Sequence, residues 1–290
     1  MKKMILLFAC FAALSLHART VDISAAYNGS KQFDQAQLSA NMALSLNTLA
    51  GLEVQMANER LFKDPVYSVA VPFALELDIL RFSLRPFYYF KNKSHLDGIQ
   101  NSSAFGLNAQ VRVKLNEDEV NENYAYAFMG ASFARQQGTS FYNDATLENR
   151  YYSQAAFMLG LSQTLYNAFG LDIEGSVFQY PDGVSDLAGF RGVMNQQDLA
   201  RTQTLDIVHA LAKYTIGTRL SRMWAENGSS AYISYRFGEY HTAQAEHSVL
   251  GGLSFRVTSR ILAEVAYNHV FTVHNQNKRD IGSVRLSTFF

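Results

Sequence analysis

Apolar and polar residues alternate along most of this chain, most regularly from residue 67 to residue 90. The apolar positions of this segment are Tyr67, Val69, Val71, Phe73, Leu75 and Leu77, then, after a break at Asp78-Ile79, Leu80, Phe82, Leu84, Pro86, Tyr88 and Phe90. Successive side chains of a strand point to opposite faces, so the pattern predicts a hairpin of two strands of about ten residues each. Strands of soluble proteins usually have about five or six residues, whereas about nine to eleven tilted residues cross a bilayer. The segment is therefore typical of membrane-spanning strands.

The same alternation recurs often enough to predict about fourteen strands, with twelve to sixteen left open. The expected strands cover residues 21–27, 38–46, 52–56, 67–77, 80–90, 105–115, 124–134, 155–161, 171–177, 210–220, 231–237, 249–257, 261–267 and 281–290. The strand at 124–134 is apolar on both faces, so its orientation is open. Elsewhere the apolar face carries no charged residue, as lipid would select, because Arg or Lys at the bilayer midplane of a barrel costs about 2–4 kcal/mol.

These strands predict an all-β fold, a transmembrane antiparallel up-and-down β-barrel. After the apolar run at residues 4–16, no stretch is long enough for a spanning helix, and strands cross a membrane only as a closed barrel. Connectors after odd strands are long or polar, and those after even strands tend to be short, which predicts that both termini lie on the periplasmic side. A secreted β-sandwich is the alternative, but its strands are shorter and its outer face needs more charge.

The chain begins like an exported protein. Lys2 and Lys3 precede the apolar run and a small residue, Ala18, follows it, so we expect residues 1–18 to be a cleaved signal peptide and residues 19–290 to form one domain. The only cysteine, Cys10, lies in the expected signal peptide, so the mature chain has no thiol chemistry. The segment from Leu7 to Cys10 is a poor match to the lipoprotein signal. Without the two lysines, 23 basic residues remain against 25 acidic ones, which argues against nucleic acid as a partner.

The last ten residues, IGSVRLSTFF, alternate and end on Phe290. This ending resembles the C-terminal signal of bacterial outer-membrane β-barrel proteins, which implies recognition by the barrel assembly machinery. Along the mature chain the architecture is similar to that of small monomeric porins. The resemblance implies a location in outer-membrane lipid and passive diffusion of small polar or ionic solutes. Thr288 and the lone Trp224 depart from the usual pattern and leave the specific family open.

If the apolar face meets lipid, the other face lines the interior. Its charged residues are Arg81, Arg85, Arg112, Lys114, Lys213, Arg219, Arg236, Arg256, Arg285, Glu53, Glu76, Asp172, Glu174 and Glu264. Neighbours such as Glu76 with Arg81, and Arg256 with Glu264, can pair and hold the register. The excess of nine basic over five acidic residues predicts a weak anion preference, with Arg81 and Arg85 as the best candidates for tuning it. Fourteen strands give a barrel about 28 Å wide, which leaves an opening on the order of 8–10 Å.

Two other classes of function remain as alternatives. One is a surface adhesin or a structural barrel without transport. The other is an outer-membrane lipase or protease, because His241, His247, Glu239, Glu246 and Ser248 lie in one external stretch; their spacing is too loose for a triad or a metal site. We therefore expect no enzyme, cofactor or metal. The long connector at 181–206 folds into the mouth of the barrel or is a solvated surface loop.

Overall fold

The computed structural model of this chain consists of antiparallel β-strands. It describes residues 20–290 except 32, 60–64, 94–98, 119, 121, 143–145, 167, 183–211, 225–227, 242–243 and 273–277. The expected signal peptide and most of the 181–206 connector therefore lie outside the described residues. No helix in the described part is long and apolar enough to cross a membrane.

Fifteen strand segments follow one another in the part of the chain that the structure describes. They are β1 (Val21–Gly29), β2 (Phe33–Ser45), β3 (Thr48–Glu59), β4 (Val66–Ala70), β5 (Phe73–Glu76), β6 (Leu80–Lys93), β7 (Ile99–Asp118), β8 (Asn123–Tyr142), β9 (Thr146–Leu165), β10 (Phe169–Gln179), β11 (Ala212–Trp224), β12 (Ser229–Tyr240), β13 (Glu246–Thr258), β14 (Ile261–Thr272) and β15 (Lys278–Phe289).

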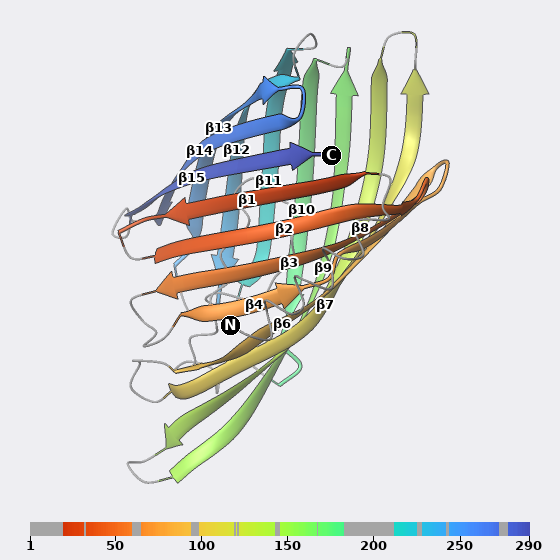
Figure 1. Ribbon diagram of the computed structural model, residues 1–290. Coiled ribbons are helices and arrows are strands. Elements are labelled where there is room, and N and C mark those ends of the chain that lie inside the picture. Colours follow the sequence, from red (N-terminus) through yellow and green to blue (C-terminus); the bar gives the residue numbers. More distant parts are fainter. Residues whose placement is uncertain are drawn as a thin grey trace.

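The strands close into a barrel. Strands that follow one another in sequence pair antiparallel, except β4 and β5, and β1 also pairs with β15 (Figure 1). The backbone amide of Phe290 donates to the carbonyl of Val21 at 2.9 Å, so the two ends of the chain complete the seam. Because β4 and β5 both pair with β3 and β6, they are two parts of one strand, and the barrel has fourteen strands. The predicted fold and strand number are confirmed.

The interruption between β4 and β5 falls at Val71 and Pro72. Proline has no amide hydrogen to donate to a ladder, which ends the regular pairing there. The neighbouring hydrogen bonds persist: Val71 N donates to Pro86 O at 3.0 Å, and Gly51 N donates to Pro72 O at 2.7 Å. The break in the wall is therefore confined to Val71 and Pro72, and the wall remains connected on both sides.

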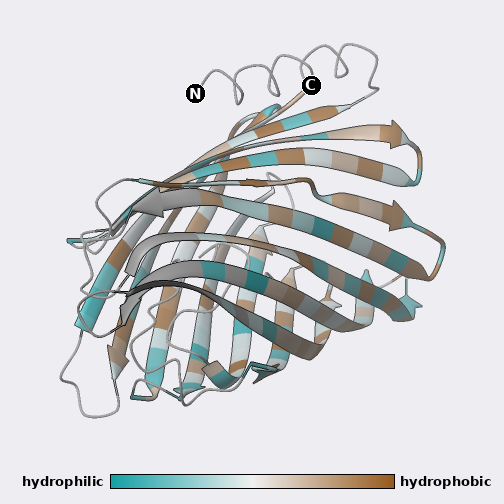
Figure 2. Cartoon of the chain, turned by 90° about the horizontal axis from the view of Figure 1, so that it is seen from below, coloured by the Kyte–Doolittle hydropathy of each residue, from teal (hydrophilic) through white to brown (hydrophobic). Residues whose placement is uncertain are grey.

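The barrel is apolar outside and contains more small polar residues inside. Leu159, Leu253 and Ile216, all at outward positions, are more than half exposed. Inward neighbours such as Ser39 and Ser132 are buried. Figure 2 shows the resulting alternation of hydrophobic and hydrophilic positions along many strands. An apolar surface of this extent is unfavourable in water and suits lipid.

We call the two ends of the barrel the turn end and the loop end. The turn end holds the short connections after β2, β5 and β13, together with Val21 and Phe290. The loop end holds the longer connections, including the one between β10 and β11. Most strands have 9 to 14 residues, but β7, β8 and β9 have 20 each. These three strands exceed the length needed to cross a bilayer, by about nine residues each.

The register also settles the orientation of β8, which the sequence left open. Met129 and Phe133 point outward and are exposed, whereas Phe128 and Ala134 point inward and are buried. Arg135, the next outward residue after Phe133, lies over the ring of Tyr151. Its position in the longer part of β8 explains how a charge occupies the outer face.

Candidate channel interior

Thirteen of the fourteen charged residues expected inside lie at inward positions of the register. These are Glu53, Glu76, Arg81, Arg85, Arg112, Lys114, Asp172, Glu174, Arg219, Arg236, Arg256, Glu264 and Arg285. Most of them lie in the turn-end half of their strands, because each follows or precedes a short turn by a few residues.

Lys213 departs from the expected alternation. The pairing of β11 with β12 shifts register between Ala212 and Tyr214, so Lys213 sits at a bulge. Its Nζ lies 3.3 Å from Glu239 Oε1, and Glu239 faces outward, paired with the outward Tyr214. A bulge places two residues opposite one and re-aims a side chain, which strict alternation in the sequence does not predict.

A cavity of about 700 Å³ lies inside the turn-end half of the barrel. Its charged lining comes from distant parts of the wall: Asp22 of β1, Glu53 of β3, Arg81 and Arg85 of β6, Asp172 of β10 and Arg219 of β11. The barrel closure thus brings together five of the charged residues expected from the sequence, together with Asp22. Their charges within this cavity are balanced, three basic and three acidic.

Two arginines of the cavity differ sharply in environment. Arg85 donates from Nε to Glu53 Oε2 at 2.8 Å, and the two side chains are only 18% and 14% exposed. Arg81 lies 3.0 Å from Glu76, as expected, but these side chains are 44% and 51% exposed. Water screens the charges of the Arg81–Glu76 pair, whereas the Arg85–Glu53 pair is partly shielded from water. Arg81 is therefore the more accessible of these two cations.

Other interior cations are held by aromatic rings. Arg219 lies 3.9 Å above the ring centre of Tyr232, whose hydroxyl donates to Glu264 at 2.6 Å. Glu264, expected to pair with Arg256, is thus engaged by a tyrosine instead. Arg112 lies 4.1 Å above Tyr126 and donates to Ser162 Oγ at 3.2 Å. Cation–π contacts of this kind stabilise an arginine without neutralising its charge.

One ion pair spans three strands of the wall. Arg236 of β12 lies 2.5 Å from Glu174 of β10, across the intervening β11. The residue of β11 between them is Gly217, where an added Cβ would lie 3.3 Å from the Glu174 carboxylate. The absence of a side chain at this position leaves room for the pair. Sequence neighbours alone do not indicate such a contact.

A further charged pair, at the loop end, was not expected from the sequence. Arg279 donates to both carboxylate oxygens of Glu246, at 2.8 and 2.9 Å, and both residues face inward. The expected strands began too late to include them, at residues 249 and 281. Extending the alternation by two or three residues would have found both.

The interior also contains apolar groups that were not expected. One buried cluster includes Val66, Phe87 and Tyr89, and another includes Leu250, Val270 and Ile281. All six lie at inward positions, toward the loop end of their strands. The inner wall is therefore charged toward the turn end and more apolar toward the loop end.

Tyr180 lies just beyond β10, where the long connector leaves the wall. Its hydroxyl donates to the carbonyl of Ala212 at 2.8 Å, which joins the end of β10 to the start of β11. Burial raises the pKa of this phenol, so the hydroxyl stays protonated and remains a donor at physiological pH.

The external residues considered for catalysis do not converge. His247 and Glu239 face outward, whereas Glu246 and Ser248 face inward. Ser248 donates to Asn268 at 2.7 Å, and the His247 ring contacts Tyr235. His241 packs edge-on against Tyr180. The wall therefore separates the groups that a triad would need.

No family model and no curated protein matches this sequence. Solved structures do match the fold. CdiB from Acinetobacter baumannii is similar with a TM-score of 0.54 and 10% identity, and the match covers 93% of this chain and 60% of that one. The chain therefore spans less than two thirds of the length of that protein. The Pseudomonas putida toluene transporter TodX matches with a TM-score of 0.50 and 8% identity, covering 96% and 90%.

Acinetobacter baumannii OccAB1 matches over 95% of this chain and 99% of that one, with 8% identity and a lower TM-score of 0.48. At these identities the likeness concerns the fold. The chain shares the closed antiparallel β-barrel fold, and no specific family is assigned.

Proposed function

We propose that this protein is an outer-membrane channel for passive diffusion of small polar or ionic solutes, with a weak anion preference. The observation that carries the proposal is the interior cavity, which charged side chains line from several sides of a closed barrel. A hollow, charged interior inside an apolar wall suits the passage of hydrated solutes.

The expected anion preference follows from the whole inner wall rather than from the cavity alone. With Lys213 removed, and Asp22, Glu117, Glu246 and Arg279 added, the inner wall carries nine basic and eight acidic residues among those whose side chains the structure describes. Partners on the wall neutralise many of the cations. A small excess of positive charge raises the local concentration of anions only modestly.

The test is planar-bilayer conductance with reversal potentials measured in a salt gradient. We expect discrete current steps and a modest preference for chloride over potassium. Arg81→Glu should shift the permeability ratio toward cations by roughly two- to tenfold, because it reverses an accessible interior charge. The matched control is Arg222→Glu, since Arg222 lies near the same end but faces outward, over Phe169.

Arg222→Glu should leave the permeability ratio unchanged. Stable insertion without current would refute the channel, and equal effects of the two variants would refute the assignment of Arg81 to the conducting path.

Export and assembly form part of the same proposal. Residues 1–18 would be removed as a signal peptide, and N-terminal sequencing of the mature protein should then begin at Arg19. The barrel assembly machinery would recognise the last strand, β15, together with Phe290. In support, Phe290 hydrogen-bonds Val21 at the seam that assembly must close.

A surface adhesin is the second candidate, and one observation favours it. The 20-residue strands β7, β8 and β9 extend past the length that a bilayer requires, toward the loop end. Such an extension presents protein surface outside the membrane. Adhesion to a host surface or matrix without any conductance would favour this function over the channel.

A further inference from the structure

A row of outward side chains crosses four strands near the loop end, away from the channel interior. Phe237, His247, Phe271 and Lys278 are direct cross-strand neighbours on β12, β13, β14 and β15. The His247 ring stacks on Phe271, with ring centres 5.1 Å apart and planes inclined by 16°. His269, two residues before Phe271 on the same face, lies 5.5 Å from that ring. The two imidazoles thus contact the Phe271 ring, and Lys278 is the cross-strand neighbour of Phe271 on the other side.

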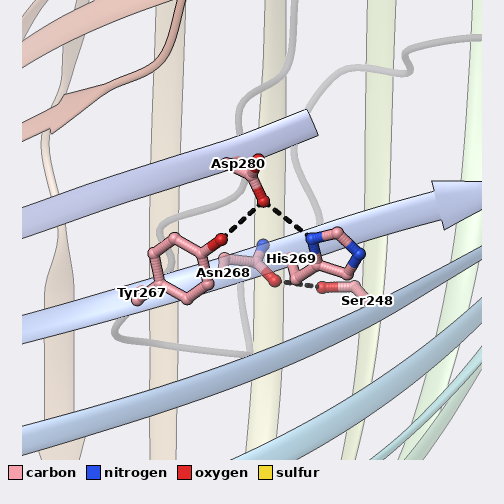
Figure 3. A network of polar contacts seen from close by, with 5 residues as sticks. All are labelled: Ser248, Tyr267, Asn268, His269 and Asp280. Carbon is pink, nitrogen blue, oxygen red and sulfur yellow. Dashed lines mark hydrogen bonds and ion pairs between the residues drawn. The ribbon is translucent and has the colours of Figure 1, made fainter. Parts of the chain in front are cut away.

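Hydrogen bonds fix one nitrogen of each imidazole. The hydroxyl of Tyr235 lies 2.6 Å from His247 Nδ1, and His269 Nδ1 lies 2.7 Å from Asp280 Oδ1. The Tyr267 hydroxyl donates to the same Asp280 oxygen at 2.6 Å (Figure 3). In each histidine the remaining nitrogen, Nε2, is then the one available to a ligand. If Tyr235 donates to Nδ1, Nε2 of His247 carries the proton and is itself a donor.

The row lies at the height where lipid headgroups meet the barrel. His247 is the second residue of β13, Phe271 is the penultimate residue of β14, and Lys278 is the first residue of β15. Outward residues at strand ends lie at the interface between hydrocarbon and water, where aromatic rings gather in membrane barrels. Asp280 and His269 are also accessible there, with side chains 58% and 36% exposed.

We propose that His247, His269 and Lys278, arranged around Phe271, bind the phosphate of a lipid headgroup in the leaflet at the loop end. Donors that carry or can acquire positive charge form strong hydrogen bonds to phosphate oxygens, and the phenyl ring beneath them meets the apolar part of the lipid. The lipid-facing position selects a membrane lipid rather than a dissolved anion. The inference rests on the proposed insertion of the barrel into a membrane, but not on conductance.

The test is native mass spectrometry of the full-length mature protein in detergent, titrated with phosphatidic acid or with diacylglycerol of the same acyl chains. We expect specific adducts with phosphatidic acid and not with diacylglycerol. The triple variant H247Q/H269Q/K278Q should bind phosphatidic acid at least about fivefold more weakly, since a single basic residue near a phosphate contributes about that factor. Lys278→Gln alone, a change at the edge of the row, should give part of the loss.

The matched control is Arg222→Gln, which removes an outward cation beside an aromatic ring at the opposite end of the barrel. It should bind phosphatidic acid as the unmodified protein does. Equal binding by the triple variant, or an equal loss in Arg222→Gln, would overturn the site. Displacement of the lipid by millimolar inorganic phosphate would show a site for the free ion and would also overturn the proposal. Heat-dependent gel migration checks that each variant is folded, so a failed barrel is distinguished from a failed lipid site.

Discussion

Two arginines of the interior show how the surroundings change the solvation of chemically identical side chains. Arg81 and Arg85 lie four residues apart on β6, and each contacts a glutamate. Arg85 and Glu53 are largely buried, whereas Arg81 and Glu76 are about half exposed. Removing one partner of a shielded pair leaves the other charge poorly solvated, while removing a partner in water has little effect.

Replacement of the two glutamates should therefore have unequal effects on stability. Glu53→Gln is expected to lower the free energy of unfolding by about 2–3 kcal/mol, and Glu76→Gln by less than about 1 kcal/mol. The measurement is the denaturant midpoint of the folded band on a gel run without boiling. Equal midpoints would show that the Arg85–Glu53 pair is as well solvated as the other. Glu53→Gln should also raise anion selectivity, because a negative charge leaves the cavity.

At the scale of the strand, alternation assigns each residue to lipid or to the interior. On β9, Leu159 faces outward and is 66% exposed, and it is paired with the outward residues Met129 and Gly175. On β7, Gln110 faces the cavity. Substitutions to the same residue type at these two positions therefore test the assignment of the two faces.

Leu159→Arg should destabilise the inserted barrel by about 2–4 kcal/mol, because the guanidinium would enter hydrocarbon near the middle of the wall. Gln110→Arg should fold normally, because its side chain would enter the hydrated interior. Refolding yield into lipid vesicles, followed by denaturant titration, measures both. A comparable loss in the two variants would contradict the assignment of the faces.

Strand order and strand type follow from local pattern, which is why most of the fold was predictable. The alternation of Leu38 to Leu46, or of Phe105 to Leu115, indicates a two-faced strand because pleating places neighbours on opposite sides. Bulges break this rule. The register shift between Ala212 and Tyr214 changes the direction of the Lys213 side chain, and no local sequence pattern indicates it.

For the whole molecule, the decisive contact is the seam between β1 and β15. It pairs residues from opposite ends of the chain, Asp22 with Phe289 and Gly29 with Gly282. A barrel without this seam would expose two unpaired strand edges to lipid, which is strongly unfavourable. The final residue takes part through its backbone bonds to Val21.

Deletion of Phe290 should therefore reduce assembly of the barrel in cells. The unmodified protein should migrate differently on a gel before and after boiling, and the deletion should leave most of the protein in the form that boiling does not change. Phe290→Tyr, which keeps an aromatic ring and the backbone bonds, serves as the control. Normal assembly of the deletion would contradict a role for the last residue.

The sequence by itself determined most of the strands, the apolar outer face, the two ends of the barrel and most of the interior charges, because these properties depend on alternation over a few residues. Only the tertiary structure decided which charges meet. The cavity that joins β6 to β11, the Glu174–Arg236 pair across Gly217, and the His247–Phe271–Lys278 row all depend on register between strands that are distant in sequence. Register is set by the closure of the whole sheet, and so no segment specifies it alone.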